Sequence, residues 1–388
     1  MTGSGLASRT WLRVVCFLVV LGILAAGLWP FHAPRNEVSW LGQGNGLRFG
    51  RHGSIVSSSQ LKLDGVPPDR PCSVEIWLAP NRPDASGTIL AFYRPDVRAV
   101  PFALRQSLDD LLVQLPARQG DPKKARVYAG HVFNRPRFVL LTISSGPTGT
   151  AIYADGNLVK KAPDFRFSTG DLTGQLIVGN SPTNTHTWSG QLREIGVYER
   201  ELSADDAAGH FANLGKSELR VAAKNQDATL LYRFDEGAGK VVHNFGDRES
   251  SAANLLIPER FFVLREQFLE SPRSEFHGGW NYWKNVGINI AGFIPLGFFC
   301  YAYFSSGSNR AVARTIALGF VVSLTIEVLQ SFLPTRDSGT TDLITNTLGT
   351  VLGAFSCVWI MKKQWFFTIE GPVVVLREER DSDLQPVK

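Results

Sequence analysis

Long runs of apolar residues lie near the two ends of this chain, whereas the middle alternates short apolar runs with turn residues. A helix needs about 20 apolar residues to cross the hydrocarbon core of a bilayer. Four runs have about this length, at residues 14–31, 285–304, 313–333 and 342–361. The pattern therefore predicts a multi-pass protein of the cell membrane, with a four-helix transmembrane α module.

Basic residues flank the four runs and predict their direction. They are Arg9 and Arg13 before the first run, Arg310 and Arg314 between the second and third, and Lys362 and Lys363 after the fourth. Loops rich in Lys and Arg stay in the cytoplasm. We therefore expect both termini to be cytoplasmic and residues 32–284 to be extracytoplasmic.

The first run has two interpretations. It could be a signal peptide that is cleaved near Ala25-Ala26-Gly27, or an anchor that the mature protein keeps. The basic flanks give one consistent orientation for all four runs only if the first run is kept. We therefore expect a retained first helix.

The middle of the chain has the pattern of an antiparallel β-sandwich. Short runs with alternating apolar residues recur every 10–15 residues or so and are separated by turn signals. Among them are "CSVEIWLAP", "GTILAFYR", "FVLLTIS", "TAIYADGNLV" and "GQLREIGVYER". In "YADGNLV", Asp155-Gly156 or Gly156-Asn157 can supply the positive φ of a hairpin turn. One helix is expected at "LSADDAAGHF", with Ser203 as its N-cap.

Three of these stretches carry a resemblance when they are taken in order. "CSVEIWLAP", "IYADGNLV" and "WSGQLREIGVYERELSADDAAGHF" resemble the laminin-G-like branch of the concanavalin-A-like jelly rolls, over about 200 residues. "LLYRFDEGAGKVVHNFGD" resembles another segment of the same group, although there it usually comes first. The resemblance implies a jelly-roll fold that binds glycans or proteins, in some members with calcium.

Candidate chemistry in the middle region is sparse. Glycosidases on this fold carry paired carboxylates on one strand face, but Glu194 and Glu199 are five residues apart and point to opposite faces. Asp155 and Asp235 are better explained as turn residues than as calcium ligands. Trp188 and Tyr198 could stack on sugar rings, but we expect them in the core. We therefore assign no catalytic residue and no metal ligand here.

The net charge and the positions of the cysteines argue against two classes of protein. The net charge is +5, without a block of Lys and Arg, which argues against a nucleic-acid partner. Three of the four cysteines lie in the apolar runs, and the middle region has only Cys72. A disulfide-stabilised domain is therefore not expected.

Polar residues inside the last three runs are the most informative feature of the sequence. Glu327 and Gln330 share one helix face, and Asp342 and Asn346 share another. A carboxylate in hydrocarbon costs roughly 2.5–3.5 kcal/mol on insertion scales, so such residues indicate a function or a tightly bonded clamp. At 1.5 Å per residue, Glu327, Asn346 and Asn289 would all lie in the outer half of the bilayer. We favour a polar site open to the outer face, with a structural clamp as the alternative.

These same runs resemble the VanZ-like family, over about 285–360 and with residues 14–31 as the first span. The motifs are "NIAGFIPLGFF", "SLTIEVLQSFLPTRDSGTTDLITNTLG" and "GTVLG". The resemblance carries the family's polar positions onto Asn289, Glu327, Gln330, Arg336, Asp342 and Asn346, which we expect to form a ligand-binding or structural cluster. It also covers Pro295, Gly297 and Gly349, which we expect, with Gly353, to serve helix packing. Founding members are linked with lowered susceptibility to the glycopeptide teicoplanin, so the resemblance implies a role in the bacterial cell envelope and in antibiotic resistance.

The sequence thus predicts five parts. They are a cytoplasmic N-terminus with the first helix (1–31), an inserted concanavalin-A/laminin-G-like β-sandwich (32–255), a juxtamembrane connector (256–284), a VanZ-like module of three helices (285–361) and a cytoplasmic tail (362–388). We expect a non-enzymatic protein with no resident cofactor. Its β-sandwich would bind an envelope glycan or a protein, and its helices a lipid-linked or glycopeptide-type ligand. Two alternatives remain open: a membrane enzyme that uses Glu327 and Asp342 for acid–base chemistry, and a structural anchor for the β-sandwich.

Overall fold

A computed structural model of the chain describes most of its residues. The described residues are 3–61, 67–116, 125–182, 187–214, 228–246, 253–264, 268–276, 278–305, 310–333, 336 and 338–369. They divide into two compact units. The helical unit comprises 1–29, 268–330 and 338–388, and the β-sandwich unit comprises 30–267 and 331–337.

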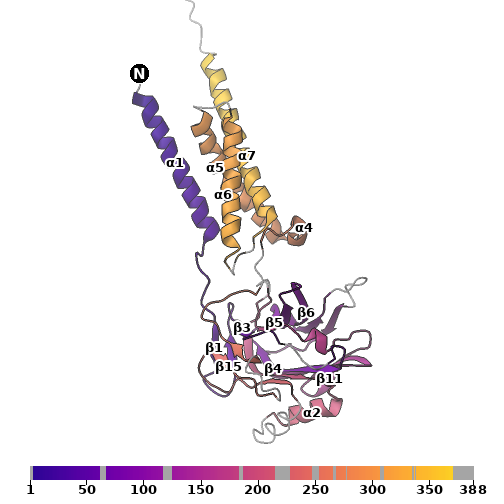
Figure 1. Ribbon diagram of the computed structural model, residues 1–388. Helices are drawn as coiled ribbons and strands as arrows, with labels where there is room; N and C mark the ends of the chain where they lie inside the picture. Colours follow the sequence, from indigo (N-terminus) through magenta and orange to yellow (C-terminus); the bar gives the residue numbers. More distant parts are fainter. Residues whose placement is uncertain are drawn as a thin grey trace, which may run out of the picture. The chain divides into compact units, whose positions relative to one another are not determined.

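The helical unit contains four long helices that run alongside one another (Figure 1). Its helices are α1 (Gly3–Leu28), α4 (Pro272–Glu275), α5 (Trp280–Ser305), α6 (Ala311–Gln330) and α7 (Thr340–Ile369). The segments Thr10–Leu28, Tyr282–Ser305, Ala311–Gln330 and Thr340–Lys363 are long and apolar enough to cross a membrane. α5 begins five residues before the predicted run, and α7 continues past Lys363, because no glycine or proline interrupts the helical sequence there.

Glycines bring α7 against its neighbours in the helical unit. A side chain at Gly349 or Gly353 would overlap the backbone carbonyls of Ile290 and Ile294 on α5. Gly297 of α5 lies against the Thr350 carbonyl of α7 in the same way. Small residues at such positions let two backbones approach closely, which is the main way that helices gain packing in lipid. Pro295 lies inside α5, directly after Ile294 and two residues before Gly297.

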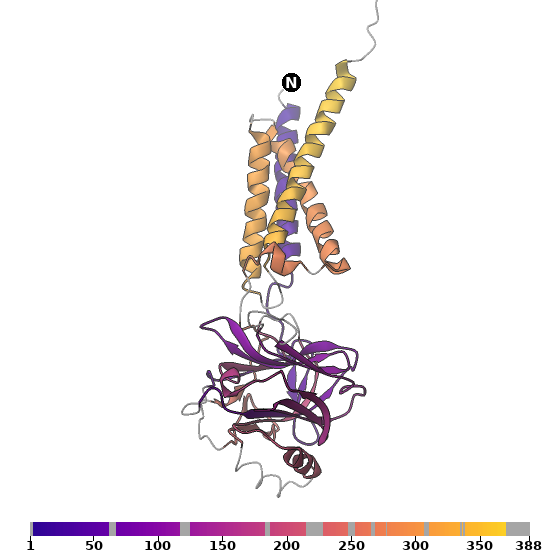
Figure 2. The ribbon, with the colours of Figure 1, turned by 90° about the vertical axis from the view of Figure 1, so that its right-hand side faces the viewer.

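The β-sandwich unit is built from two antiparallel sheets, whose layers are visible in Figure 2. The first sheet has the strand order β1-β2-β13-β4-β9-β10-β11, with β14 paired to β13. Its strands are β1 (Val38–Trp40), β2 (Leu47–Phe49), β4 (Cys72–Pro80), β9 (Val139–Gly146), β10 (Gly149–Ala154), β11 (Asn157–Ala162), β13 (Gly190–Tyr198) and β14 (Leu230–Tyr232).

The second sheet has the order β15-β16-β3-β12-β5-β6-β7-β8. Its strands are β3 (Ile55–Ser57), β5 (Ser86–Arg94), β6 (Ala99–Ser107), β7 (Asp110–Gln114), β8 (Arg126–Ala129), β12 (Gln175–Val178), β15 (Val241–Val242) and β16 (Leu255–Leu256). One large apolar cluster fills the space between the sheets, with Phe49, Ile76, Phe102 and Leu141 fully buried in it. This is the sandwich that the alternating pattern predicts, because successive side chains of a strand point to opposite faces.

The hairpin turn and the capped helix that the sequence predicts are both present. Asp155 and Gly156 have φ values of +50° and +77°, so they make the tight turn between β10 and β11. The short helix α2 (Ala204–Ala212) is capped by Ser203, whose hydroxyl accepts a hydrogen bond from the Asp206 N–H at 3.1 Å. A 3₁₀ turn, η2, spans Thr169–Asp171. The hairpin and the capped helix are therefore confirmed.

Candidate functional site

The polar side chains of the helical unit meet where α6 ends and α7 begins. The Glu327 carboxylate of α6 is 1% exposed, and its Oε2 accepts a hydrogen bond from the Gly339 N–H at 2.9 Å. Gly339 directly precedes α7. The first N–H groups of a helix lack partners within the helix and carry a partial positive charge, so an acceptor with a negative charge is favourable there. Glu327 thus anchors the start of α7.

Two further polar contacts join the helices one turn apart. The Asn289 Nδ2 of α5 donates to the Asp342 Oδ1 of α7 at 2.7 Å. The Asn346 Nδ2 of α7 donates to the Ser323 hydroxyl of α6 at 3.0 Å. Asp342 and Asn346 are four residues apart on one face of α7, as are Ser323 and Glu327 on α6. Together these contacts hold α7 against both α5 and α6.

Two buried amide oxygens of this cluster have no hydrogen-bond donor in the described part of the chain. The Gln330 Nε2 donates to the Gly27 carbonyl of α1 at 2.8 Å, but its Oε1 has no partner among the described residues. The same holds in that part of the chain for the Oδ1 of Asn346, a side chain that is 5% exposed. A buried acceptor without a donor costs about 1–3 kcal/mol. These oxygens could accept hydrogen bonds from a ligand that carries hydroxyl or N–H groups.

Arg336 belongs to the segment between α6 and α7. Residues 331–337 cluster with the β-sandwich unit, and Asp337 falls outside the described residues. The Arg336 N–H donates to the Leu333 carbonyl at 3.0 Å. An ion pair between Glu327 and Arg336 therefore stays a prediction.

Two residues of the cluster, Ser323 and Ser338, were not predicted from the sequence. Ser323 precedes Glu327 by one helical turn, so helical spacing could have identified it. Ser338 is fully buried, and its hydroxyl accepts a hydrogen bond from the Leu269 N–H at 3.3 Å. The backbone of Glu270 bonds to Ser338 and Thr340 on either side of Gly339, at 3.1 and 3.0 Å. No local signal could have paired segments 70 residues apart.

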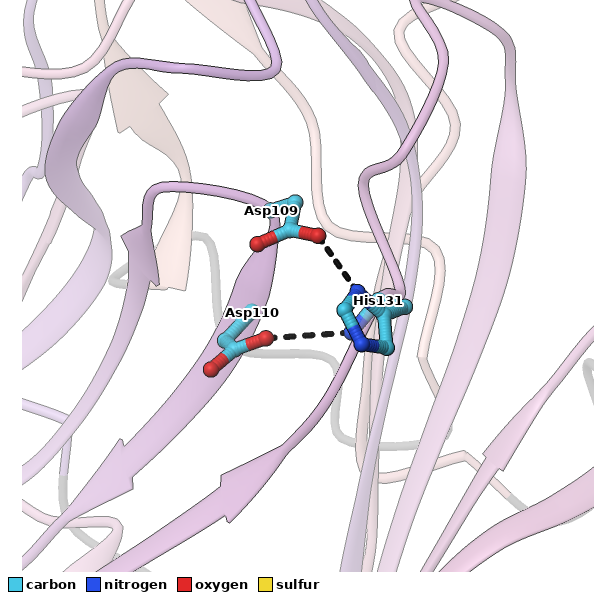
Figure 3. Close-up of side chains that lie close together, drawn as sticks. All are labelled: Asp109, Asp110 and His131. Carbon is cyan, nitrogen blue, oxygen red and sulfur yellow. Dashed lines mark hydrogen bonds and ion pairs between the residues drawn. The ribbon is translucent and has the colours of Figure 1, made fainter.

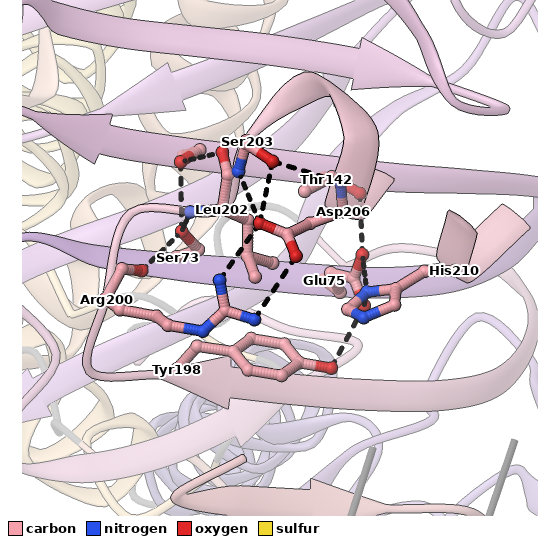
Figure 4. Close-up of polar contacts among 10 residues, drawn as sticks. Ser73, Glu75, Thr142, Tyr198, Arg200, Leu202, Ser203, Asp206 and His210 are labelled. Atoms are coloured by element: carbon pink, nitrogen blue, oxygen red, sulfur yellow. Dashed lines mark hydrogen bonds and ion pairs between the residues drawn. The ribbon is translucent and has the colours of Figure 1, made fainter. Parts of the chain in front are cut away.

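A second polar cluster lies on the outer face of the first sheet, below α2 (Figure 4). The Glu75 carboxylate is 1% exposed and contacts three side chains. It accepts from the Thr142 hydroxyl at 2.8 Å and from the Tyr198 hydroxyl at 3.1 Å, and the His210 Nδ1 of α2 lies 3.0 Å from both of its oxygens. Burial and the nearby Glu75 and Glu194 carboxylates raise the pKa of Tyr198 well above its usual value. Tyr198 therefore stays protonated and donates.

The same cluster fixes the start of α2 on the sheet. The Ser73 hydroxyl donates to the Arg200 carbonyl at 2.8 Å, and the Ser144 hydroxyl donates to the Leu202 carbonyl at 2.8 Å. Burial acts to raise the pKa of Asp206, but hydrogen bonds from Arg200 and Ser203 outweigh it and lower the pKa to about 2. These contacts join the buried Glu75 carboxylate and its neighbours to α2 and so anchor the helix on the sheet.

Strand pairing places two carboxylates on one face of the first sheet. Glu75 of β4 and Glu194 of β13 share the outer face of these adjacent strands. Glu194 lies opposite Trp77, and Glu75 lies opposite Gly196. A comparison within one strand cannot find this pair, because strand pairing brings together residues over 100 positions apart.

The other candidates of the β-sandwich unit lie as expected. Trp188 and Tyr198 are fully buried, and the Trp188 Nε1 donates to Gln106 at 2.9 Å. Asp155 lies in the hairpin turn and pairs with Arg137, and Asp235 lies 3.5 Å from the Arg233 guanidinium. Core packing is therefore confirmed for Trp188 and Tyr198, and the turn position is confirmed for Asp155.

Asp109, Asp110 and His131 converge at the tip of the β6–β7 hairpin (Figure 3). Their ligand atoms lie within 4.8 Å of one another. The Asp109 Oδ2 lies 2.6 Å from the His131 Nδ1, and this contact raises the pKa of His131. The Asp110 Oδ1 accepts a hydrogen bond from the backbone N–H of His131 at 3.0 Å. Calcium takes six to eight oxygen ligands, so this set of two carboxylates and one imidazole does not fit calcium.

The fold and the site define a class of protein. Four helices of membrane length, with buried polar contacts, are combined with a sandwich of two antiparallel sheets. This is a multi-pass membrane protein that carries a globular β-sandwich domain.

Family models name both parts. Residues 229–362 match the VanZ/LLP1 family, and residues 50–208 match the concanavalin A-like lectin/glucanases superfamily. Both resemblances that the sequence showed are therefore confirmed. The VanZ/LLP1 match begins well before residue 285 and so includes the last strands of the sandwich. No curated protein matches the chain.

Several solved structures resemble the β-sandwich weakly. A proposed carbohydrate-binding protein of Bacteroides ovatus is 12% identical, with 57% of this chain and 61% of that chain covered and a TM-score of 0.37. The ligand binding domain of botulinum neurotoxin serotype D in complex with N-acetylneuraminic acid is 13% identical, with 46% and 45% covered and a TM-score of 0.34. A pentraxin from Limulus polyphemus is 13% identical, with 46% and 78% covered and a TM-score of 0.31. The chain thus spans less than half of the neurotoxin structure, and at these values the likeness carries no argument about function.

Proposed function

We propose that this chain is a bacterial cell-envelope membrane protein with two binding sites. Its helical unit would bind the hydrogen-bonding part of a lipid-linked or glycopeptide-type ligand in the outer half of the membrane. Its β-sandwich would bind an envelope glycan. The proposal keeps residues 32–284 extracytoplasmic, with the basic residues around 310 and 362 as its support.

The Asn346 carboxamide is the observation that carries the helical site. Its nitrogen is held by Ser323, while its oxygen has no donor among the described residues although the side chain is buried. Within an apolar bundle such an oxygen is costly. A ligand hydroxyl or amide N–H would satisfy it, and the unpaired oxygen of Gln330 on the adjoining helix offers a second acceptor.

The neighbouring carboxylates are suited to positioning. Glu327 anchors the start of α7, and Asp342 holds the Asn289 amide. These contacts fix α5, α6 and α7 around Asn346 and so preorganise the site. The cluster contains no thiol or imidazole, and its arrangement suits binding better than nucleophilic chemistry.

Native mass spectrometry of the full-length protein tests the helical site. Protein purified from its own membranes should retain a bound lipid-linked species, and Asn346→Leu should lose it. Ser356→Ala is the matched control, because Ser356 lies on the exposed face of α7 and its hydroxyl donates to the Leu352 carbonyl of the same helix. Equal retention by wild type, Asn346→Leu and Ser356→Ala would contradict a site at Asn346.

A glycan array probed with the full-length protein in nanodiscs tests the β-sandwich. The match to a superfamily that includes lectins supports glycan binding. We expect binding to envelope-type polysaccharides. Failure to bind any glycan, neutral or charged, would contradict this part of the proposal and favour a structural anchor.

A further inference from the structure

The outer face of the second sheet carries a group of polar side chains near its β8 edge. Along β6, β7 and β8, Leu104, Val113 and Val127 point into the core. The alternate residues Arg105, Gln114, Arg126 and Tyr128 therefore share the opposite face. Gln114 of β7 lies directly opposite Arg126 of β8. Leu112 of β7 lies opposite Arg105 of β6 on one side and opposite Tyr128 of β8 on the other. These four side chains are called the basic face below.

Two arginines of the basic face have no ion pair with a carboxylate among the described residues. Arg105 is half-buried, and its Nη1 donates to the Gln114 Oε1 at 3.4 Å, whereas its buried Nε has no partner in the described part of the chain. Burial lowers the pKa of the Arg105 guanidinium, and the neighbouring charge of Arg126 lowers it further. Among the described residues, no carboxylate lies within ion-pair distance of either arginine. Two like charges are thus held together.

Four other arginines of the β-sandwich unit are paired with carboxylates. Arg82, Arg137, Arg200 and Arg233 pair with Asp84, Asp155, Asp206 and Asp235. Arg105 and Arg126 differ from these four, because the charge that acts on Arg105 is that of another arginine. Repulsion between two neighbouring guanidinium groups is relieved when an anion binds between them, because a guanidinium presents a fixed fork of donors to carboxylate or phosphate.

The strand next to β8 carries two lysines, and the basic face itself includes an aromatic ring. β11 lies beside β8 at the sandwich edge and carries the exposed Lys160 and Lys161. Tyr128 is 44% exposed on the same face as Arg105. An exposed aromatic ring offers a flat apolar surface with a polar tip, on which the C–H face of a sugar ring can pack. Gln114 offers an amide to sugar hydroxyls.

We propose that the basic face binds an acidic glycan, a polysaccharide whose sugars carry carboxylate or other anionic groups. Arg105 and Arg126 bind the anionic groups, and Tyr128 supports a sugar ring between them. This inference rests on the proposed glycan binding of the β-sandwich and names its face and its ligand class.

A matched pair of polysaccharides tests the inference. Full-length protein in nanodiscs of phosphatidylcholine is titrated with polygalacturonate and with its methyl-esterified form, which has the same sugar backbone without the charge. We expect binding of polygalacturonate alone, weakening as salt is raised because ions screen the contact. Arg105→Gln with Arg126→Gln should weaken binding about tenfold or more, since each arginine supplies a charge-assisted contact.

Control variants test whether the effect depends on the basic face or only on the total positive charge of the β-sandwich. Arg48 and Arg51 are exposed on and beside β2 of the other sheet, so Arg48→Gln with Arg51→Gln removes the same charge elsewhere. This control should bind like wild type. Arg126→Gln alone, at an exposed position, serves if the double variant fails to fold, and should weaken binding several-fold.

The inference would be overturned by equal binding of both polysaccharides, by equal weakening in the control pair, or by undiminished binding of Arg126→Gln. It would also be overturned if the arginine substitutions abolished attachment to anionic lipid vesicles and left glycan binding unchanged. Binding of neutral glycans alone would contradict the acidic ligand and leave glycan binding by the sandwich intact. Binding of no glycan would contradict both.

Discussion

Four glycines of the helical unit should respond in opposite directions to the same substitution. A methyl group at Gly353 would meet the Ile294 carbonyl carbon and the Phe298 nitrogen of α5 at 2.9 Å, and one at Gly349 would meet the Ile290 backbone at 3.0 Å. Both obstacles are backbone, which cannot rotate away. At Gly287 and Gly292, also within helices, nothing lies within 4 Å.

The magnitudes follow from two competing effects. Alanine is favoured over glycine inside a helix by up to about 1 kcal/mol. Forcing a methyl group into a closely packed contact costs about 1–3 kcal/mol, because the helices must move apart. Gly349→Ala and Gly353→Ala should therefore lower the free energy of unfolding by about 1–2 kcal/mol. Gly287→Ala and Gly292→Ala should leave it unchanged or raise it by up to about 1 kcal/mol.

Unfolding of the full-length protein by SDS in mixed micelles measures these changes, with pulse proteolysis at the α6–α7 loop as the readout of helix separation. The comparison of positions within one protein removes general effects of the detergent. A shift of the same sign and size at Gly353 and Gly292 would refute the close α5–α7 contact.

Three further predictions follow from single contacts and from topology. Glu327→Gln keeps an acceptor for the Gly339 N–H but loses the charge, so the free energy of unfolding in the same SDS assay should fall by about 1–2 kcal/mol. Glu327→Leu should lower it further, because it also removes the acceptor. A fully stable Glu327→Leu variant would contradict the anchoring role. Asp206 has a lowered pKa of about 2, so its contribution is present above the ordinary carboxyl pKa near 3.8 and is lost as the pH falls toward 2. Asp206→Asn should therefore reduce the thermal stability of the β-sandwich at pH 7 and flatten its dependence between pH 4 and pH 2, and an unchanged pH profile would contradict the bond to Arg200. Reporter fusions after residues 150 and 308 should give opposite signals, and equal signals would contradict the four-span topology.

The sequence by itself determined which segments form each element. Apolar runs of about 20 residues correspond to the four long helices, because length and hydropathy alone decide whether a helix can span a bilayer. Alternation in "CSVEIWLAP" placed Val74, Ile76 and Leu78 in the core of the sandwich. Ser203 and the Asp155-Gly156 pair set a helix start and a hairpin, since caps and turns depend on a few neighbouring residues.

Part of the polar cluster was also accessible from helical spacing. Glu327 with Gln330, and Asp342 with Asn346, could be assigned to shared faces because residues three or four apart are neighbours on a helix. Spacing within one helix cannot say which face of α6 meets which face of α7. Two contacts depend on how distant helices pack: the Asn346 amide donates to the Ser323 hydroxyl, and the Glu327 carboxylate accepts from the Gly339 N–H just before α7.

Only the tertiary structure decided the pairings between strands. The register of β4 against β13 brings Glu75 and Glu194 to one face, and the fold-back of α2 brings His210 onto Glu75. The grouping of Arg105, Gln114, Arg126 and Tyr128 likewise depends on the registers of β6, β7 and β8. Such contacts join residues whose separation along the chain carries no periodic signal, because they are fixed by the burial of the whole core and not by any local pattern.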